Sequence, residues 1–182
     1  MATALMILAN GFEEIEALSV VDILRRAHVQ VEMAGLESKE VKGSHEICVK
    51  ADVVLSEVLD RLYDVVILPG GEPGTTHLQN SPLVERILQN HRSEQKKIAA
   101  ICAAPRILDQ MGFLNGKQAT SFPGTRPMMR NCLYQEAETV WDDPILTSRG
   151  PGTAMAFGFA IVEQLVSWQM AQDLKSSMVY SL

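Results

Sequence analysis

The sequence predicts an α/β fold, a flavodoxin-like three-layer α/β/α sandwich with a mostly parallel sheet, as a single domain over residues 1–182. Three apolar runs of strand length, at 3–9, 63–68 and 97–101, carry this prediction, because strands buried on both faces of a sheet read as continuous apolar sequence. A turn and a segment with helical spacing follow each run. Such alternation is typical of parallel sheets covered by helices on both faces.

Helix and turn signals place the remaining elements. Ser81 followed by Pro82 marks a helix start, with serine as N-cap and proline at the first helical position. Pro69, Gly70 and Gly71 predict a tight loop after the second strand. In chain order we expect a helix at 13–27, a strand at 29–33, a polar connection at 35–44, a short strand at 46–50, helices at 82–91 and 106–111, a short strand at 118–121, a short helix at 123–131, a hairpin of 139–141 with 145–148, a helix capped by Thr153 and reaching 166, and a last helix ending near 179.

Composition excludes several classes of protein. The net charge of −6 comes without any basic cluster, so nucleic-acid binding has no electrostatic basis. No apolar run reaches the roughly 18 residues of a membrane span. The apolar stretch 4–9 lacks a basic flank and leads into glutamates, unlike a signal peptide, and we expect a cytoplasmic protein. The three cysteines, at positions 48, 102 and 132, are widely spaced and odd in number, which indicates neither a disulfide framework nor a metal site.

Cys102 stands at the end of the third apolar run, directly before Ala103, Ala104 and Pro105. A cysteine at a sharp junction between strand and helix has the arrangement of a nucleophile elbow. The positive end of the following helix would favour the thiolate over the thiol. The alternative is that Cys102 is a small buried apolar residue, as free cysteines often are.

Other reactive groups follow the ends of neighbouring strands. In sheets of this class, ligands bind beyond the carboxyl ends of the strands. Three glutamates in one helical turn point in different directions, so at most one of them is expected to face the crevice. The groups expected at this edge are Glu13, Glu14 and Glu16, the Gly70-Gly71 turn, Cys102, and the turn from Arg149 to Gly152.

A glutamate beside Cys102 in a dry cleft would hold a proton, because desolvation raises the pKa of a carboxyl group. It could then donate a hydrogen bond to the thiolate and lower the pKa of the thiol. The N–H groups of Gly71 and Ala103 are candidate oxyanion donors, although the glycines could equally form a plain turn. Among the histidines, His45 and His77 are candidates for the pocket rim.

With these residues in place, the sequence resembles the ThiJ/PfpI superfamily, in the branch of the parkinsonism-associated protein deglycase and the bacterial YajL-like proteins. Four motifs in order carry the resemblance across nearly the whole chain. They are Ile7-Leu8-Ala9 followed by Gly11 to Glu16, Asp64 to Gly71, Ala99 to Pro105, and Leu146 to Thr153.

The resemblance implies a flavodoxin-like homodimer with an oxidation-prone cysteine at the elbow. It implies Cys102 as the nucleophile, Glu16 as its protonated carboxyl partner, and the N–H groups of Gly71 and Ala103 as the oxyanion site. Arg26 matches an arginine that, in the family, reaches the site across the dimer interface. The other expected rim residues are Gly70, His45, Ser148 and Arg149.

Three positions depart from the family pattern. Phe122 stands where many animal members carry a histidine near the cysteine, so this position offers no Cys–His pair. Ala103 stands where peptidase relatives carry a histidine, which argues against peptidase activity. His45 stands where several relatives have an arginine.

The expected function is that of a cysteine-dependent glyoxalase or deglycase without cofactor or metal, acting on methylglyoxal-type aldehydes or on glycated amines and thiols. An alternative is a redox-sensing stress protein or chaperone that works through oxidation of Cys102. A thiamine-related or thiazole-related role rests only on the family's historical name.

Overall fold

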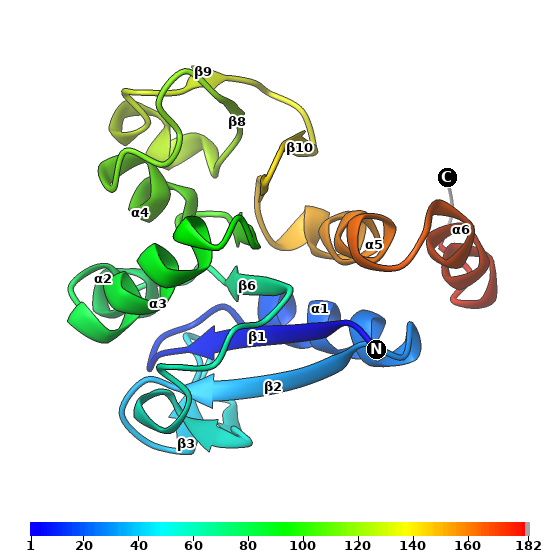
Figure 1. Ribbon diagram of the computed structural model, residues 1–182, viewed down its shortest axis with the longest axis horizontal. Helices are drawn as coiled ribbons and strands as arrows, with labels where there is room; N and C mark the ends of the chain where they lie inside the picture. The colour runs from blue at the N-terminus through cyan, green and yellow to red at the C-terminus, as the bar shows by residue number, and fades with distance from the viewer. Residues whose placement is uncertain (181–182) are drawn as a thin grey trace.

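The computed structural model describes residues 1–180 and has a seven-stranded sheet at its centre, in the order β10-β11-β7-β6-β1-β2-β5 (Figure 1). Neighbouring strands are parallel except for β10 and β11, which form an antiparallel hairpin. The strands are β1 Thr3–Leu8, β2 Gln30–Gly35, β5 Val53–Val54, β6 Val65–Leu68, β7 Lys97–Ile101, β10 Thr139–Asp142 and β11 Ile145–Ser148. The predicted α/β class with a mostly parallel sheet is confirmed.

Two helical layers cover the sheet, and in Figure 1 α2, α3 and α4 gather to the left while α5 and α6 lie to the right. Side chains of β1 alternate between the two layers, because successive residues of a strand point to opposite faces. Met6 and Leu8 pack with α1, α5 and α6, whereas Leu5 and Ile7 pack with α3 and α4. The helices are α1 Glu14–Arg26, α2 Gly74–Gln79, α3 Pro82–Ser93, α4 Pro105–Gln110, α5 Ala154–Leu165 and α6 Trp168–Ser177.

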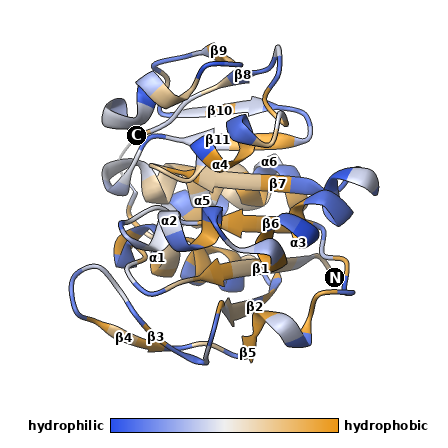
Figure 2. Cartoon of the chain, turned by 90° about the vertical axis from the view of Figure 1, so that its left-hand side faces the viewer, coloured by the Kyte–Doolittle hydropathy of each residue, from blue (hydrophilic) through white to orange (hydrophobic). Residues whose placement is uncertain are grey.

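Short elements surround this framework. Two small sheets pair β3 Glu40–Lys42 with β4 Cys48–Lys50, and β8 Gln118–Ala119 with β9 Leu133–Tyr134. The 3₁₀ helices within residues 1–180 are η1 Leu55–Glu57, η2 Pro123–Met128 and η3 Pro151–Thr153. Figure 2 shows the hydrophobic residues concentrated on β1 and β6 between the helical layers. Within residues 1–180, no helix is long and apolar enough to cross a membrane.

The predicted long helices, the three apolar strands and the hairpin are confirmed, with ends that differ by a few residues. Strand β3 lies inside the segment that was predicted as a polar connection. The strand was missed because Val41 is the buried apolar residue in it, between exposed Glu40 and Lys42. Helix α2 follows the Gly70-Gly71 turn, where only a loop was expected. Thr153 precedes α5 as predicted, yet its hydroxyl does not cap that helix and accepts the N–H groups of Arg149 and Gly150 instead, at 3.2 and 3.1 Å.

Candidate active site

Cys102 occupies a sharp turn directly after β7, with a backbone φ of +64°. Non-glycine residues rarely adopt this left-handed conformation, and such strain clusters at functional sites. Two hydrogen bonds hold the turn: the Cys102 N–H donates to the carbonyl of Ser148 at 3.0 Å, and the Phe122 N–H donates to the carbonyl of Cys102 at 2.8 Å. The predicted elbow geometry is therefore confirmed, with a half-buried thiol at its tip.

Of the three candidate glutamates, Glu16 is the one that contacts Cys102. Its side chain is fully buried, and its Oε2 accepts the N–H of Gly70 at 2.7 Å. Burial raises the pKa of Glu16 to about 7, against the lowering effects of the Cys102 thiol and the Gly70 N–H. Its Oε1 has no hydrogen-bond partner within residues 1–180. An ionised carboxylate with an orphaned buried oxygen is costly, so this environment favours the protonated acid.

Neighbouring groups shift the pKa of the Cys102 thiol in opposite directions. Burial and the Glu16 carboxylate raise its pKa, while the N–H groups of Ala103 and Gly71 lower it. The sequence predicted a low pKa for this thiol, and the structure corrects that expectation: while Glu16 is ionised, the pKa of Cys102 is raised. Each negative charge opposes the other, so Cys102 becomes a thiolate most readily when Glu16 keeps its proton.

Gly70 gives Glu16 and Cys102 the room to meet. A methyl group placed on Gly70 would lie 2.6 Å from Cβ of Cys102 and 2.7 Å from Oε2 of Glu16, closer than real Cβ contacts. Gly71 has φ of +89°, a conformation that favours glycine, and its N–H faces the sulfur. The glycine pair is therefore part of the site and more than a plain turn.

Glu13 and Glu14 turn away from the thiol and form a separate cluster with His45 in the β3–β4 loop. The Nδ1 of His45 lies 3.0 Å from Oε2 of Glu14 and 3.5 Å from Oε2 of Glu13. Ligand atoms of these three residues lie within 4.8 Å of one another, so they are the group within residues 1–180 whose spacing could hold a metal ion. Sequence reasoning missed this cluster, because about 30 residues separate its two halves.

The pKa of Glu14 in this cluster is lowered, whereas that of Glu16 is raised. Although burial raises the pKa of Glu14, hydrogen bonds from His45 and from the Ile47 N–H outweigh it and hold that pKa below its usual value. In return, the hydrogen bond to Glu14 and the charge of Glu13 raise the pKa of His45. Hydrogen bonds to Glu14 thus hold His45 at the start of α1. In the same region, the Glu13 N–H donates to the Gly70 carbonyl at 2.9 Å.

The other predicted rim residues are spread more widely. Ser148 is buried beside the elbow, where its hydroxyl bonds to the Glu138 carbonyl and to Thr153 at 2.8 and 2.7 Å. Arg149 points its guanidinium at the carbonyl of Glu136, at 3.0 Å. Arg26 pairs with Asp22 at the far end of α1, and its predicted reach across a dimer interface stays a prediction.

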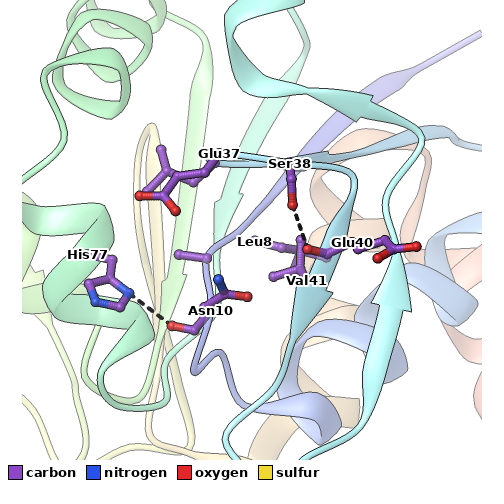
Figure 3. Close-up of a pocket in the computed structure, with 9 residues that line it drawn as sticks. Leu8, Asn10, Glu37, Ser38, Glu40, Val41 and His77 are labelled. Carbon is purple, nitrogen blue, oxygen red and sulfur yellow. Dashed lines mark hydrogen bonds between the residues drawn. The ribbon is translucent and has the colours of Figure 1, made fainter.

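His77 lies outside the Cys102 site. Its Nδ1 is 3.0 Å from the carbonyl oxygen of Asn10, beside a small cavity of about 20 Å³ that Leu8, Ser38 and Val41 also line (Figure 3). Four larger surface hollows in residues 1–180 also lie away from the thiol.

Residues 2–164 match the model of the DJ-1/PfpI family. Protein dj-1beta of Drosophila melanogaster is 40% identical over 180 residues, covering 97% of this chain and 96% of the relative. A protein of Caenorhabditis elegans named glutathione-independent glyoxalase is 33% identical over 154 residues, covering 84% of this chain and 82% of the relative.

The solved structure of oxidized Toxoplasma gondii DJ-1 superposes with a TM-score of 0.97 at 33% identity, covering all of both chains. This likeness extends over the whole sheet and both helical layers. The chain therefore belongs to the DJ-1/PfpI family, in its DJ-1 (Parkinson disease protein 7) branch.

Proposed function

We propose that the protein is a cysteine-dependent glyoxalase or deglycase that needs no cofactor and acts on 2-oxoaldehydes such as methylglyoxal, or on their early adducts with amines and thiols. The observation that carries the proposal is the meeting of the Cys102 thiol, the Glu16 carboxyl and the N–H groups of Gly71 and Ala103 at one elbow. The glyoxalase name of the nematode relative supports the same reaction class.

In the proposed reaction, Sγ of Cys102 adds to the aldehyde carbon of methylglyoxal. A C–S bond forms, and the carbonyl oxygen gains a proton, which gives a hemithioacetal. Glu16 would hold the proton while the sulfur attacks and would then pass it to the oxygen. The N–H groups of Gly71 and Ala103 would stabilise the negative charge on that oxygen.

The hemithioacetal carbon then loses its hydrogen as a proton, and an enediol forms. Return of a proton to the neighbouring carbon converts the former ketone to an alcohol and the former aldehyde carbon to a thioester. Water hydrolyses the thioester to lactate and frees the thiol. The aldehyde carbon is oxidised and the ketone carbon reduced within one molecule, so no external oxidant or reductant is needed.

The test is lactate formation from methylglyoxal by the wild type, Cys102→Ser and Cys48→Ser. Cys48 is an exposed free thiol on β4, away from the elbow, and serves as the matched control. We expect Cys102→Ser to lose at least ~100-fold in kcat/KM and Cys48→Ser to match the wild type. Equal rates in all three proteins, or no lactate from any of them, would refute the proposal.

A second candidate function is redox sensing through Cys102. The observation that favours it is the half-exposed thiol facing two N–H groups, which would receive the oxygen atoms of a sulfenate or sulfinate. Intact mass and peptide mapping after graded peroxide treatment should show Cys102 gaining oxygen before Cys48 and Cys132. Uniform oxidation of the three cysteines would count against this role.

The protein is also proposed to form a homodimer. Ile15 on α1 and Ile47 before β4 are 55% and 53% exposed, and the two residues flank the Glu14–His45 cluster, as expected for part of an apolar contact surface. Light scattering coupled to size-exclusion chromatography should give twice the chain mass of 20.0 kDa, and Ile15→Asp should shift it towards the monomer. A wild-type monomer would contradict the proposal.

A further inference from the structure

Phe122 presents a half-exposed aromatic ring beside the nucleophile. The residue is 45% exposed. Its N–H donates to the Cys102 carbonyl at 2.8 Å, and its own carbonyl accepts the N–H and the hydroxyl of Thr125 at 2.9 and 2.8 Å. These bonds hold the backbone of Phe122 in position beside that of Cys102.

Gly150 leaves room for a methyl-sized group between this ring and the sulfur. A methyl group placed on Gly150 would lie 3.4 Å from Cδ2 of Phe122 and 4.0 Å from Sγ of Cys102. The φ of Gly150 is 165°, extended backbone that any residue adopts, so backbone conformation does not demand glycine here. What the glycine provides is a volume that touches both the aromatic ring and the reacting atom.

Phe122 offers apolar contact on its side of this volume. The nearest arginines along the chain are engaged elsewhere: Arg149 donates to the Glu136 carbonyl, and Arg126 pairs with the Glu136 carboxylate at 2.8 Å. Phe122 itself has no hydrogen-bonding side-chain group, in contrast to the histidine of many animal relatives. A substrate substituent that enters this space would meet the face or edge of a benzene ring.

We propose that Phe122 and Gly150 form an apolar subsite for the substituent on the ketone carbon of the substrate, so that the enzyme prefers aryl-substituted and larger alkyl-substituted 2-oxoaldehydes to methylglyoxal. The inference rests on the proposed function and names its substrate class. Once sulfur has added to the aldehyde carbon, the ketone carbon is one bond further on, and its substituent comes within reach of the ring. Aromatic pairs in offset or edge-to-face contact add to the gain from apolar burial alone.

The kinetic test compares phenylglyoxal with methylglyoxal as substrates of the wild type, Phe122→Ala, Phe122→Leu and Leu133→Ala. Leu133 on β9 is 59% exposed and is the matched control for removal of a surface apolar side chain. We expect Phe122→Ala to lower kcat/KM for phenylglyoxal by about 10-fold and for methylglyoxal by less than about 3-fold. Phe122→Leu should recover part of the preference, and Leu133→Ala should leave both values unchanged. Equal losses on both substrates would overturn the subsite.

A second measurement, the rate at which Cys102 is alkylated, needs no turnover and therefore tests the subsite separately from the glyoxalase proposal. 2-Bromoacetophenone and bromoacetone carry the same two substituents, phenyl and methyl, next to a carbonyl. Each alkylates a thiol by forming a C–S bond as bromide leaves, and intact mass reports the rate at Cys102 in a protein whose Cys48 and Cys132 are serine.

The ratio of the two alkylation rates, phenyl over methyl, should fall about 10-fold from the wild-type background to Phe122→Ala, since intrinsic reactivity cancels in the comparison. An unchanged ratio would overturn the subsite even if the protein turns over both aldehydes. A changed ratio without any turnover would retain the subsite and refute the glyoxalase proposal alone.

Discussion

Glu14 and Glu16 lie two residues apart in the first turns of α1, and both are buried, yet the structure moves their pKa values in opposite directions. Glu14 accepts hydrogen bonds from the His45 N–H at 2.7 Å and from the Ile47 N–H at 3.5 Å, and it faces the His45 ring. Glu16 accepts one N–H, from Gly70, and its other oxygen has no partner within residues 1–180.

Burial alone therefore does not determine the charge of a carboxyl group. Desolvation raises the pKa of both glutamates, and only at Glu14 do enough donors surround the carboxylate to reverse it. A glutamate that is well supplied with donors is a structural anion, whereas one that lacks them is an acid that can give up and recover a proton near neutral pH. The following predictions test this contrast.

The largest expected effect is on catalysis. Glu16→Gln should lower kcat/KM for methylglyoxal by ~10²–10⁴-fold, because glutamine cannot exchange a proton with the substrate oxygen. Glu14→Gln should stay within about 3-fold of the wild type, since Glu14 touches no reacting atom. Steady-state kinetics of both variants checks the prediction. A comparable loss in the two variants would show that charge at the start of α1 matters and proton transfer does not.

The next effect concerns the glycines against which the two carboxyl groups pack. A methyl group on Gly70 would collide with Glu16 and Cys102, whereas one on Gly43 would collide with the Glu14 carboxyl group. We expect Gly70→Ala to lower kcat/KM by ~10²-fold, because small misplacements of reacting groups are costly. Gly43→Ala should lower the free energy of unfolding by about 1–3 kcal/mol while activity changes little. Urea unfolding and kinetics together distinguish the two variants, and the contrast fails if Gly43→Ala is the less active one.

The stability of the two glutamine variants should depend on pH in opposite ways. The folded protein raises the pKa of Glu16 from 4.5 to about 7, so the folded state binds more protons in that window and the wild type loses stability as pH rises through it. Glu16→Gln should therefore gain up to about 3 kcal/mol relative to the wild type between pH 5 and pH 8.

The pKa of Glu14 shifts in the opposite direction, so its effect on stability depends on pH in the opposite way. Its folded pKa lies below 4.5, so its contribution to stability is present above pH 4.5 and is lost as pH falls through the folded pKa. The destabilisation caused by Glu14→Gln should be full at pH 7 and shrink under acid conditions. Urea unfolding across this pH range provides the measurement for both variants, and parallel pH profiles would contradict the contrast.

The smallest effect is a shift in one titration curve. The hydrogen bond to Glu14 raises the pKa of His45 above 6.5, although the imidazole is largely exposed. An NMR titration should show this raised pKa in the wild type and its return towards 6.5 in Glu14→Gln. An unchanged pKa of His45 in Glu14→Gln would contradict the proposed effect of Glu14 on His45.

Much of the fold and the elbow was predictable from local sequence. Continuous apolar runs identified β1, β6 and β7, because strands covered on both faces leave no position for polar side chains. The position of Cys102 at the end of such a run, before small residues and Pro105, was enough to predict a nucleophile elbow. The Glu13–Glu14–His45 cluster escaped prediction, since its contacts join segments about 30 residues apart and leave no periodic signal. Strand β3 pairs with the nearby β4 and escaped prediction because its three residues are too few to show an alternating pattern.

The sequence by itself determined the α/β class, the strand that carries Cys102 and the set of three glutamates from which its partner comes. The family resemblance named Glu16 as that partner, and the folded structure shows Glu16 in contact with the thiol. The charge of each carboxyl group, and the methyl-sized space between the Phe122 ring and the sulfur, became evident only in the folded structure. The physical reason is that strand and helix signals are local, whereas a pKa depends on which donors the folded chain brings to a buried carboxyl group.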